Sequence, residues 1–384
     1  MLLDAPTLSG WAMKPTGTSF LVGISEMKER HILFALCALC WTFSGCGRGV
    51  FYAVGTESKV VPDPPLSLLW ERKLDAAPMG RALNAATLVM QMSTGASLYA
   101  FDPYSGDRLG KKTFDRGICG PPAMVGDVVL LGSQGKDAAL LAWDRRLEET
   151  RWKQAGTFCL PPVVRGDTLI VSSEHGLIRA VDFSTGALLW ERNLEVLVRA
   201  APVLRGNRLI VGDGKGVIRG LRLRDGEEVW RDSVDSGVRV RPLVGLEHIW
   251  LGTAAGQIAA LDGKTGVLQW QIDVGGLPSG EMALTEGILA VGSVDRSVYG
   301  IEAATGSVRW KYATEGVVRG SPAAVKGVFY IGSSDGYLYA LDASGGDLPW
   351  KFRLEGAVTE GVSWVGETLV VMTEKKILYA FGRR

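Results

Sequence analysis

Few side chains in this chain could perform chemistry, and their spacing fits no catalytic motif. The sequence holds three histidines and five cysteines, without the His/Cys spacing of a zinc site and without H-E-x-x-H or G-x-S-x-G. His175 takes a position that Asp335 fills in another copy of a repeat described below, which predicts a turn residue. Residues Gly212–Gly216 resemble a phosphate loop, but they lie between apolar runs rather than before a helix, which favours a glycine-rich turn. The sequence therefore predicts no catalytic residue, no metal site and no cofactor.

The charge balance excludes one large class of function. The 384 residues carry 42 Lys and Arg against 41 Asp and Glu, a formal net charge of +1. Proteins that bind nucleic acid normally present a strongly basic face. We therefore expect no nucleic acid among the partners.

The N-terminal region has the features of a secretion signal. Residues 27–31, which include Lys28 and Arg30, are followed by an apolar run over residues 32–43 that is too short to cross a bilayer. The small residues Ser44 and Gly45 before Cys46 resemble the bacterial lipobox, in which the cysteine is lipidated. This pattern predicts a leader over residues 1–45 with translation starting at Met27, and lipidation at Cys46. The alternatives are an ordinary cleaved signal peptide and a buried strand.

The segment after the lipobox has the composition of a linker. Residues 46–65 contain Gly, Ser and three prolines, which predicts a lipidated tether. Gly47 after the cysteine resembles Gram-negative lipoproteins that are sorted to the outer membrane. The resemblance implies a lipid anchor in the outer membrane with the protein facing the periplasm, where disulfides persist.

Tryptophan and glycine are abundant, and the tryptophans are periodic. The chain has 50 Gly and 12 Trp, and seven tryptophans follow one register in which a position near Gly110 lacks its member. The spacing is about 40 residues, which is typical of propellers and solenoids whose units pack on their neighbours. A large apolar ring with one N–H predicts packing between units, with an acceptor for each indole. The seven are Trp70, Trp152, Trp190, Trp230, Trp270, Trp310 and Trp350.

One copy of the repeat shows the elements of the unit. Val317–Val325 and Val328–Gly332 are apolar runs joined by a turn, and Tyr337–Leu341 and Leu348–Leu354 follow. The Asp-Gly pair before Tyr337 is a strong hairpin signal. Recurring acidic turns such as Asp262–Gly266 are predicted to be structural, because the aspartate accepts backbone N–H groups while glycine takes the left-handed position. Four strands in about 40 residues form one blade of a β-propeller.

The two ends of the repeated region predict that the blades close into a ring. In the eighth repeat the third strand, Ile377–Phe381, is followed by no fourth strand. A spare strand of the fourth type, Leu66–Leu74, precedes the first complete blade. Pairing these two strands completes blade eight and removes the open edges of a linear array. We therefore expect an all-β chain in which residues 66–384 form a single closed eight-bladed β-propeller of four-stranded blades.

A further set of equivalent positions, which includes arginines and cysteines, becomes visible when the repeats are aligned on their tryptophan positions. Nine residues after the tryptophan position, near the start of the first strand, stand Arg199, Arg239 and Arg319, and also Cys119. Cys159, in the blade next to that of Cys119, joins this set once a deletion of two residues after Trp152 is allowed. The arginines are either an anion-attracting rim at one mouth of the channel or caps for backbone carbonyls between blades. The cysteines form a disulfide if their Cα atoms lie within about 7 Å, and otherwise remain two thiols.

The unit Gly336–Asp342, followed by Gly346 and Trp350, resembles the repeat of pyrroloquinoline quinone (PQQ)-type propellers. The resemblance covers residues 66–384 and differs from WD40 repeats, whose Trp-Asp pair ends a strand in each blade. Proteins with this repeat are mainly quinoprotein dehydrogenases and non-catalytic lipoproteins of the BamB type. A predicted lipobox followed by a bare eight-fold repeat resembles the second group.

That resemblance implies a function and a partner. It implies a non-catalytic scaffold, a monomeric propeller within a larger complex, that takes part in the assembly and insertion of outer-membrane β-barrel proteins. The partner would be the periplasmic domains of a BamA-like barrel insertase. In such proteins an inter-blade segment with leucines and an arginine contacts the insertase, and residues 194–199 with Leu197 and Arg199 are similar in kind; Arg239 and Arg319 share the register of Arg199.

Two other functions remain open at this point. A PQQ-binding quinoprotein oxidoreductase or sensor would carry two adjacent cysteines and long insertions around the cofactor, and the chain has neither. A lipoprotein scaffold for a different periplasmic or surface partner fits the same residues, because function lies in the inter-blade loops rather than in the fold.

Overall fold

The computed structural model describes residues 63–383 apart from residues 86, 87 and 116. The chain divides into two units, Met1–Gly47 and Arg48–Arg384, and the described residues all belong to the second. The predicted leader, the lipidation site Cys46 and the tether up to residue 62 lie outside the described residues. No helix among the described residues is long and apolar enough to cross a lipid bilayer.

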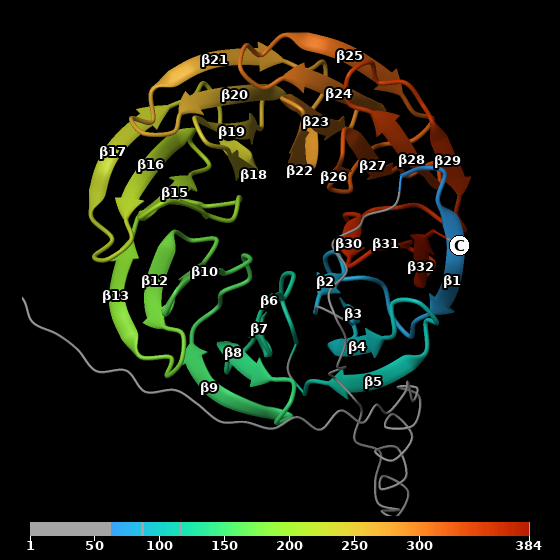
Figure 1. Ribbon diagram of the computed structural model, residues 1–384. Coiled ribbons are helices and arrows are strands. Elements are labelled where there is room, and N and C mark those ends of the chain that lie inside the picture. Colours follow the sequence, from blue (N-terminus) through green and yellow to red (C-terminus); the bar gives the residue numbers. More distant parts are fainter. Residues whose placement is uncertain (1–62, 86–87, 116, 384) are drawn as a thin grey trace, which may run out of the picture. The chain divides into compact units, whose positions relative to one another are not determined.

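The described residues form eight four-stranded antiparallel sheets that are arranged as the blades of a ring (Figure 1). In each blade the strands below are given from the innermost to the outermost. Blades 1 to 4 are β2 (Leu83–Asn84), β3 (Val89–Met92), β4 (Ser97–Phe101) and β5 (Arg108–Thr113); β6 (Ala123–Val125), β7 (Val128–Gly132), β8 (Ala139–Asp144) and β9 (Glu149–Ala155); β10 (Val163–Arg165), β11 (Thr168–Ser172), β12 (Leu177–Asp182) and β13 (Leu188–Asn193); and β14 (Val203–Arg205), β15 (Arg208–Gly212), β16 (Val217–Arg222) and β17 (Glu228–Ser233). Blades 5 to 8 are β18 (Val238–Val244), β19 (His248–Thr253), β20 (Gln257–Asp262) and β21 (Leu268–Asp273); β22 (Pro278–Thr285), β23 (Ile288–Ser293), β24 (Ser297–Glu302) and β25 (Val308–Ala313); β26 (Ala323–Val325), β27 (Val328–Gly332), β28 (Tyr337–Asp342) and β29 (Trp350–Arg353); and β30 (Ser363–Val365), β31 (Thr368–Met372), β32 (Ile377–Gly382) and β1 (Ser67–Lys73).

The ring is closed by strands from both ends of the described chain. Strand β1 pairs antiparallel with β32, and Trp70 stands opposite Ala380 in the register. The predicted closed eight-bladed propeller, with an N-terminal strand completing the last blade, is confirmed. Closure leaves no blade without a neighbour on either face.

The innermost strand of the repeat is shorter than the sequence predicts. Only the last three residues of the expected strand Val317–Val325 pair in the sheet, as β26. The backbone before it bonds to turns instead: the N–H of Val318 donates to the carbonyl of Ser293 at 3.2 Å. The segment before β26 therefore connects two blades.

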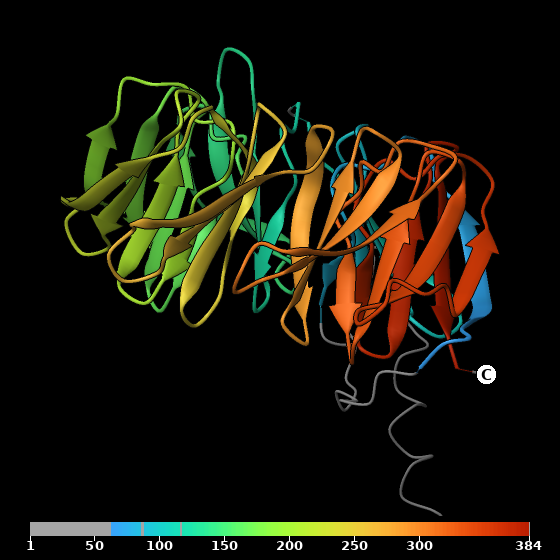
Figure 2. The ribbon, with the colours of Figure 1, turned by 90° about the horizontal axis from the view of Figure 1, so that it is seen from above.

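The strands run between the two ends of the ring (Figure 2). At one end, which we call the connection end, each outermost strand passes to the innermost strand of the next blade. The hairpins between second and third strands lie at this end too. The opposite end carries the other two turns of each blade.

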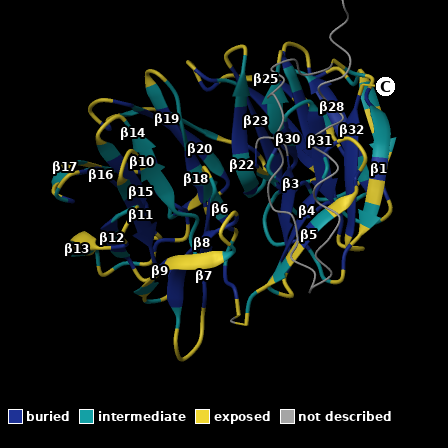
Figure 3. Ribbon diagram, turned by 60° about the horizontal axis from the view of Figure 1, so that its bottom comes forward, coloured by how far each residue is buried: buried dark blue, intermediate teal, exposed yellow. Residues whose placement is uncertain are grey.

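The core lies between the blades rather than in one central cluster. Every residue of β7 and β8 is buried, whereas the outermost strand β9 alternates between buried Trp152 and exposed charged residues. Figure 3 shows the buried second and third strands between innermost and outermost strands that are partly exposed. Because both faces of these second and third strands are covered, they appear in the sequence as continuous apolar runs.

The periodic tryptophans connect each blade to the next one. Trp70 packs on Gly106 of the following blade, and its Nε1–H donates to the carbonyl of Pro103 at 2.9 Å. Gly106 has φ +69°, and a Cβ there would lie 2.5 Å from the indole, so only glycine fits. The same N–H to turn-carbonyl bond is made by Trp152, Trp190 and Trp310.

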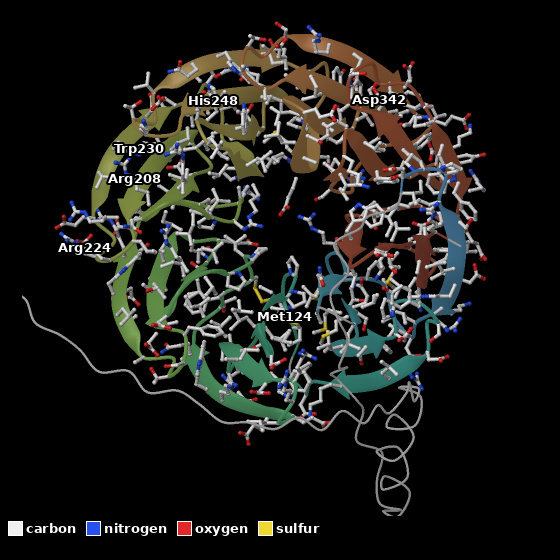
Figure 4. The ribbon with its side chains drawn as sticks, viewed as in Figure 1. Met124, Arg208, Arg224, Trp230, His248 and Asp342 are labelled. Carbon is white, nitrogen blue, oxygen red and sulfur yellow. A yellow bond between two sulfur atoms is a disulfide. The ribbon has the colours of Figure 1, made fainter. Side chains whose placement is uncertain are left out.

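The other three periodic tryptophans, Trp230, Trp270 and Trp350, do not make this bond within the part of the chain that the structure describes. Among the described residues, the Nε1 atoms of Trp230 (Figure 4) and Trp270 are buried without an acceptor. For Trp270 the cause is competition, because Trp250 of the same blade donates to the carbonyl of Ala303 at 2.8 Å. Ala303 is at the turn position that Ala343 holds for Trp310.

The empty tryptophan position at Gly110 is filled from the neighbouring blade. Where blade 7 places Leu341 in the cluster around Trp310, blade 2 has Trp143, which is buried and meets Phe114 edge-on at 5.6 Å. The exchange is incomplete, because a cavity of about 180 Å³ lined by Phe114 and Trp143 remains between blades 1 and 2.

The recurring acidic residues hold turns together. Asp262 accepts the backbone N–H groups of Lys264 and Thr265 at 2.9 and 2.7 Å, and these bonds lower the pKa of its carboxyl group. Hydrogen bonds from Ser184 and Thr185 lower the pKa of Asp182 to about 2 in the same way. These carboxylates therefore stabilise turns of the fold.

Candidate functional site

The connection end of the ring holds the arginine register in place through backbone bonds to two blades. The N–H of Val198 donates to the carbonyl of Glu174 in blade 3 at 2.9 Å, and the carbonyl of Leu197 accepts the N–H of Gly214 in blade 4 at 2.7 Å. In the same way the N–H of Val238, which begins blade 5, donates to the backbone carbonyl of Asp213 in blade 4 at 2.9 Å. The side chains that follow are therefore presented from fixed backbone.

The three arginines of this register carry free guanidinium groups. Arg199, Arg239 and Arg319 are exposed, and within residues 63–383 as described none of their side chains makes a hydrogen bond or an ion pair. Capping of backbone carbonyls does occur at the opposite end, where Arg165 and Arg205 donate to Gly206 and Leu246 of the next blade. Of the two interpretations of the register, the geometry favours the anion-attracting rim.

Cys119 and Cys159 lie at the same level of neighbouring blades and are joined by a disulfide. Their Cα atoms are 5.0 Å apart. A Cβ on Gly120 would lie 1.7 Å from the carbonyl oxygen of Cys159, so the glycine permits this approach. The bond links blades 2 and 3 at the connection end.

A cluster that sequence reasoning missed lies deeper in the ring. Glu281 on β22 pairs with Arg241 on β18 at 3.3 Å and with Arg81, which precedes β2 in a blade that is not its neighbour. Other blades have proline or a small residue at the same register position, two after the arginine register: Pro121, Pro161, Ala201, Ser321 and Gly361. The charged residues Arg81, Arg241 and Glu281 at a position that otherwise holds proline or a small residue were the signal in the sequence that could have identified the cluster.

The ion cluster stands between two cavities in the centre of the ring. A cavity of about 320 Å³ is lined by Arg199 and Arg239. A second, of about 430 Å³, is lined by Arg81 and Glu360. Both include Arg241 and Glu281 in their walls. Figure 4 shows side chains that project from the inner strands toward this centre.

Two groups in these walls are electrostatically unusual. The Nε atom of Arg241 is buried and, among the described residues, has no acceptor. Burial raises the pKa of Glu360, although its carboxylate accepts the backbone N–H of Gly80. Buried polar groups without partners are rare in folded proteins.

The segment predicted to meet a partner combines a rigid backbone with exposed side chains. Leu197 is 49% exposed beside the exposed Arg199. The Asn193 side chain accepts the N–H of Glu195 at 3.0 Å, which fixes the start of the segment. Arg239 lies with Arg199 in the wall of one cavity, whereas Arg319 holds the equivalent position in blade 7.

The remaining polar motifs form turns. His175 is exposed in the turn between β11 and β12. In Gly212–Gly216, Asp213 is buried, accepts the N–H of Lys215 at 2.8 Å and pairs with Arg219 at 2.7 Å. No group of three or more His, Cys, Asp or Glu side chains in the described part of the chain could hold a metal ion.

Comparisons with known proteins agree on the fold. The family model described as outer membrane protein assembly factor BamB matches residues 94–246 and 254–384. Similar solved structures include BamB from Moraxella catarrhalis (20% identity, TM-score 0.70, 83% of this chain and 99% of that one) and the computationally designed Ika8 protein (16%, 0.71, 81% and 98%). They also include a europium-containing methanol dehydrogenase (13%, 0.69, 83% and 93%). No curated protein sequence matches significantly.

Proposed function

The chain belongs to the family of outer membrane protein assembly factor BamB, and from this premise we propose that it is a non-catalytic lipoprotein scaffold in the assembly and insertion of outer-membrane β-barrel proteins. It is anchored through Cys46, faces the periplasm, and binds the periplasmic domains of a BamA-like insertase.

One observation carries the proposal. Leu197 and Arg199 are exposed on a segment whose backbone is bonded to blades 3 and 4. An exposed leucine on fixed backbone loses little conformational entropy on binding, which favours a protein contact. Its arginine neighbour offers five N–H donors to an acidic partner.

Crosslinking from Leu197 tests the contact. A photoreactive p-benzoylphenylalanine at Leu197 should capture a barrel insertase in membranes, whereas the same group at Leu246 should not. Leu246 is 95% exposed on the hairpin between β18 and β19, at the opposite end of the ring. Capture from Leu246 alone, or of an unrelated periplasmic protein from Leu197, would contradict the proposal.

The anchor is tested separately. Cys46→Ala should abolish incorporation of labelled fatty acid and release the protein from the outer-membrane fraction. Retention of label in this variant would contradict lipidation at Cys46, while leaving the partner contact to the crosslinking result.

The quinoprotein alternative is tested on the same purified protein. The likeness to a methanol dehydrogenase concerns the fold. The donors in the ring do not fit a Ca²⁺ site, because Glu281 is already paired with Arg81 and Arg241. We expect no dye reduction after incubation with PQQ and Ca²⁺, and reduction would refute the scaffold proposal.

A further inference from the structure

The centre of the ring contains arginine groups whose hydrogen-bonding capacity is unused. Arg199, Arg239 and Arg241 all line the cavity of about 320 Å³. In the described residues the first two make no hydrogen bond or ion pair, and the Nε–H of Arg241 is buried without an acceptor. A buried donor without a partner is costly, so the Nε–H of Arg241 favours an acceptor that enters the cavity.

The charges in this wall favour an anion. Three guanidinium groups face the cavity against one carboxylate, Glu281, which is shared with Arg81 from across the ring. The whole chain has a net charge of +1, so this is a local concentration of positive charge. The two exposed arginines at the opening would attract an anion toward the buried one.

The geometry indicates which anion. A guanidinium presents a planar fork of donors that matches a carboxylate. Glu281 contacts one of these donors on Arg241, the Nη1 atom, at 3.3 Å. Ser279 and Ser321 in the same wall add hydroxyl groups. A volume of about 320 Å³ lies near the lower end for pockets that hold small molecules.

We propose that this cavity, which we call the arginine chamber, binds a carboxylate-bearing ligand through Arg199, Arg239 and Arg241. The carboxylates belong either to a small polycarboxylate or to acidic side chains of a peptide. The site does not depend on the proposed scaffold function, because it needs no membrane and no insertase.

Replacement of Glu281 should change the affinity for the ligand in the direction opposite to that expected for a purely structural residue. Its carboxylate competes with the ligand for Arg241. Glu281→Gln removes that negative charge and should therefore tighten binding. A residue that merely held the fold would weaken binding when replaced.

Titration calorimetry on the full chain tests the chamber with three probes: citrate, a tetraglutamate peptide and a tetraglutamine peptide. We expect citrate or tetraglutamate to bind at one site, and tetraglutamine not to bind. Citrate alone would identify a free polycarboxylate, and tetraglutamate alone a peptide.

Variants then locate the site. Arg199→Gln with Arg239→Gln should weaken binding by at least about tenfold, the loss of one charge-assisted hydrogen bond. Arg224→Gln should leave it unchanged, because Arg224 lies on the outer side of the ring (Figure 4). Added salt should weaken binding in the wild type. The proposal is overturned if neither anion binds, if Arg224→Gln weakens binding equally, or if Glu281→Gln weakens it.

Discussion

The outer turns and the centre of the ring use polar groups in opposite ways. At the outer turns, the indole N–H of Trp310 donates to Ala343 at 2.8 Å, and Asp342 (Figure 4) accepts the N–H of Ser344 at 2.9 Å. In the centre, arginines of the register have no partner among the described residues. The difference teaches that polar groups whose hydrogen bonds are made within the ring build the fold, whereas polar groups that keep unused donors mark the candidate site.

The largest expected effect lies at the outer turns. Trp310→Ala should lower the free energy of unfolding by about 3–5 kcal/mol, because it removes a buried ring and leaves a cavity. Arg319→Ala, at the connection that follows, should change it by less than about 0.5 kcal/mol. Denaturant midpoints of the two variants measure the contrast. Equal losses would break the distinction between turns and centre.

The disulfide is expected to rank next. Cys119→Ser with Cys159→Ser opens a loop with a sequence separation of 40. The chain-entropy model gives a loss of about 2–4 kcal/mol for such a loop. The mass of the denatured wild type should rise by two hydrogens on reduction, and an unchanged mass would disprove the bond.

The empty tryptophan position provides a test within the repeat. Gly110→Trp should destabilise the protein by about 1–3 kcal/mol, because Trp143 already occupies the space and the core becomes overpacked. Trp143→Leu in the same chain should restore most of the loss, since blade 7 pairs leucine with tryptophan there. Thermal unfolding of both variants measures this, and additivity of the two changes would contradict the explanation.

The two regions should also respond to pH with opposite signs. The pKa of Asp182 is lowered to about 2 by hydrogen bonds from Ser184 and Thr185, so its contribution is present at neutral pH and lost as the pH falls toward 2. Burial raises the pKa of Glu360, so its ionised form costs stability at neutral pH, and that cost is relieved as the pH falls.

Substitution of each carboxylate checks the signs. Asp182→Asn should lower stability at pH 7, and Glu360→Gln should raise it. Both differences should shrink on acidification. Denaturation of the two variants at neutral and acidic pH measures them, and a destabilising Glu360→Gln at pH 7 would contradict the burial argument.

The sequence predicted the fold almost completely because the repeat is local. Turn residues and apolar runs recur within each unit, and the spare strand Leu66–Leu74 predicted β1 and the closure. The errors concerned strand bounds: β26 is shorter than Val317–Val325, because the backbone before it bonds to neighbouring turns, and β29 is shorter than Leu348–Leu354.

The candidate site was less predictable because it depends on distance across the ring. The register located Cys119 and Cys159, but it could not show that Arg81 reaches Glu281, since the two lie 200 residues apart in sequence in blades that do not adjoin. They meet because the ring is closed and narrow enough for side chains from non-adjacent blades to reach each other at its centre.

Because β1 pairs with β32, the ring closes only when both strands are present in the chain. A chain interrupted before Ile377 would leave β1 without its partner, and blades 1 and 8 would expose faces that the full chain covers. Exposed faces and unpaired strand edges are features that lead to aggregation and proteolysis. Pairing of β1 with β32 therefore protects the faces of blades 1 and 8 from both processes.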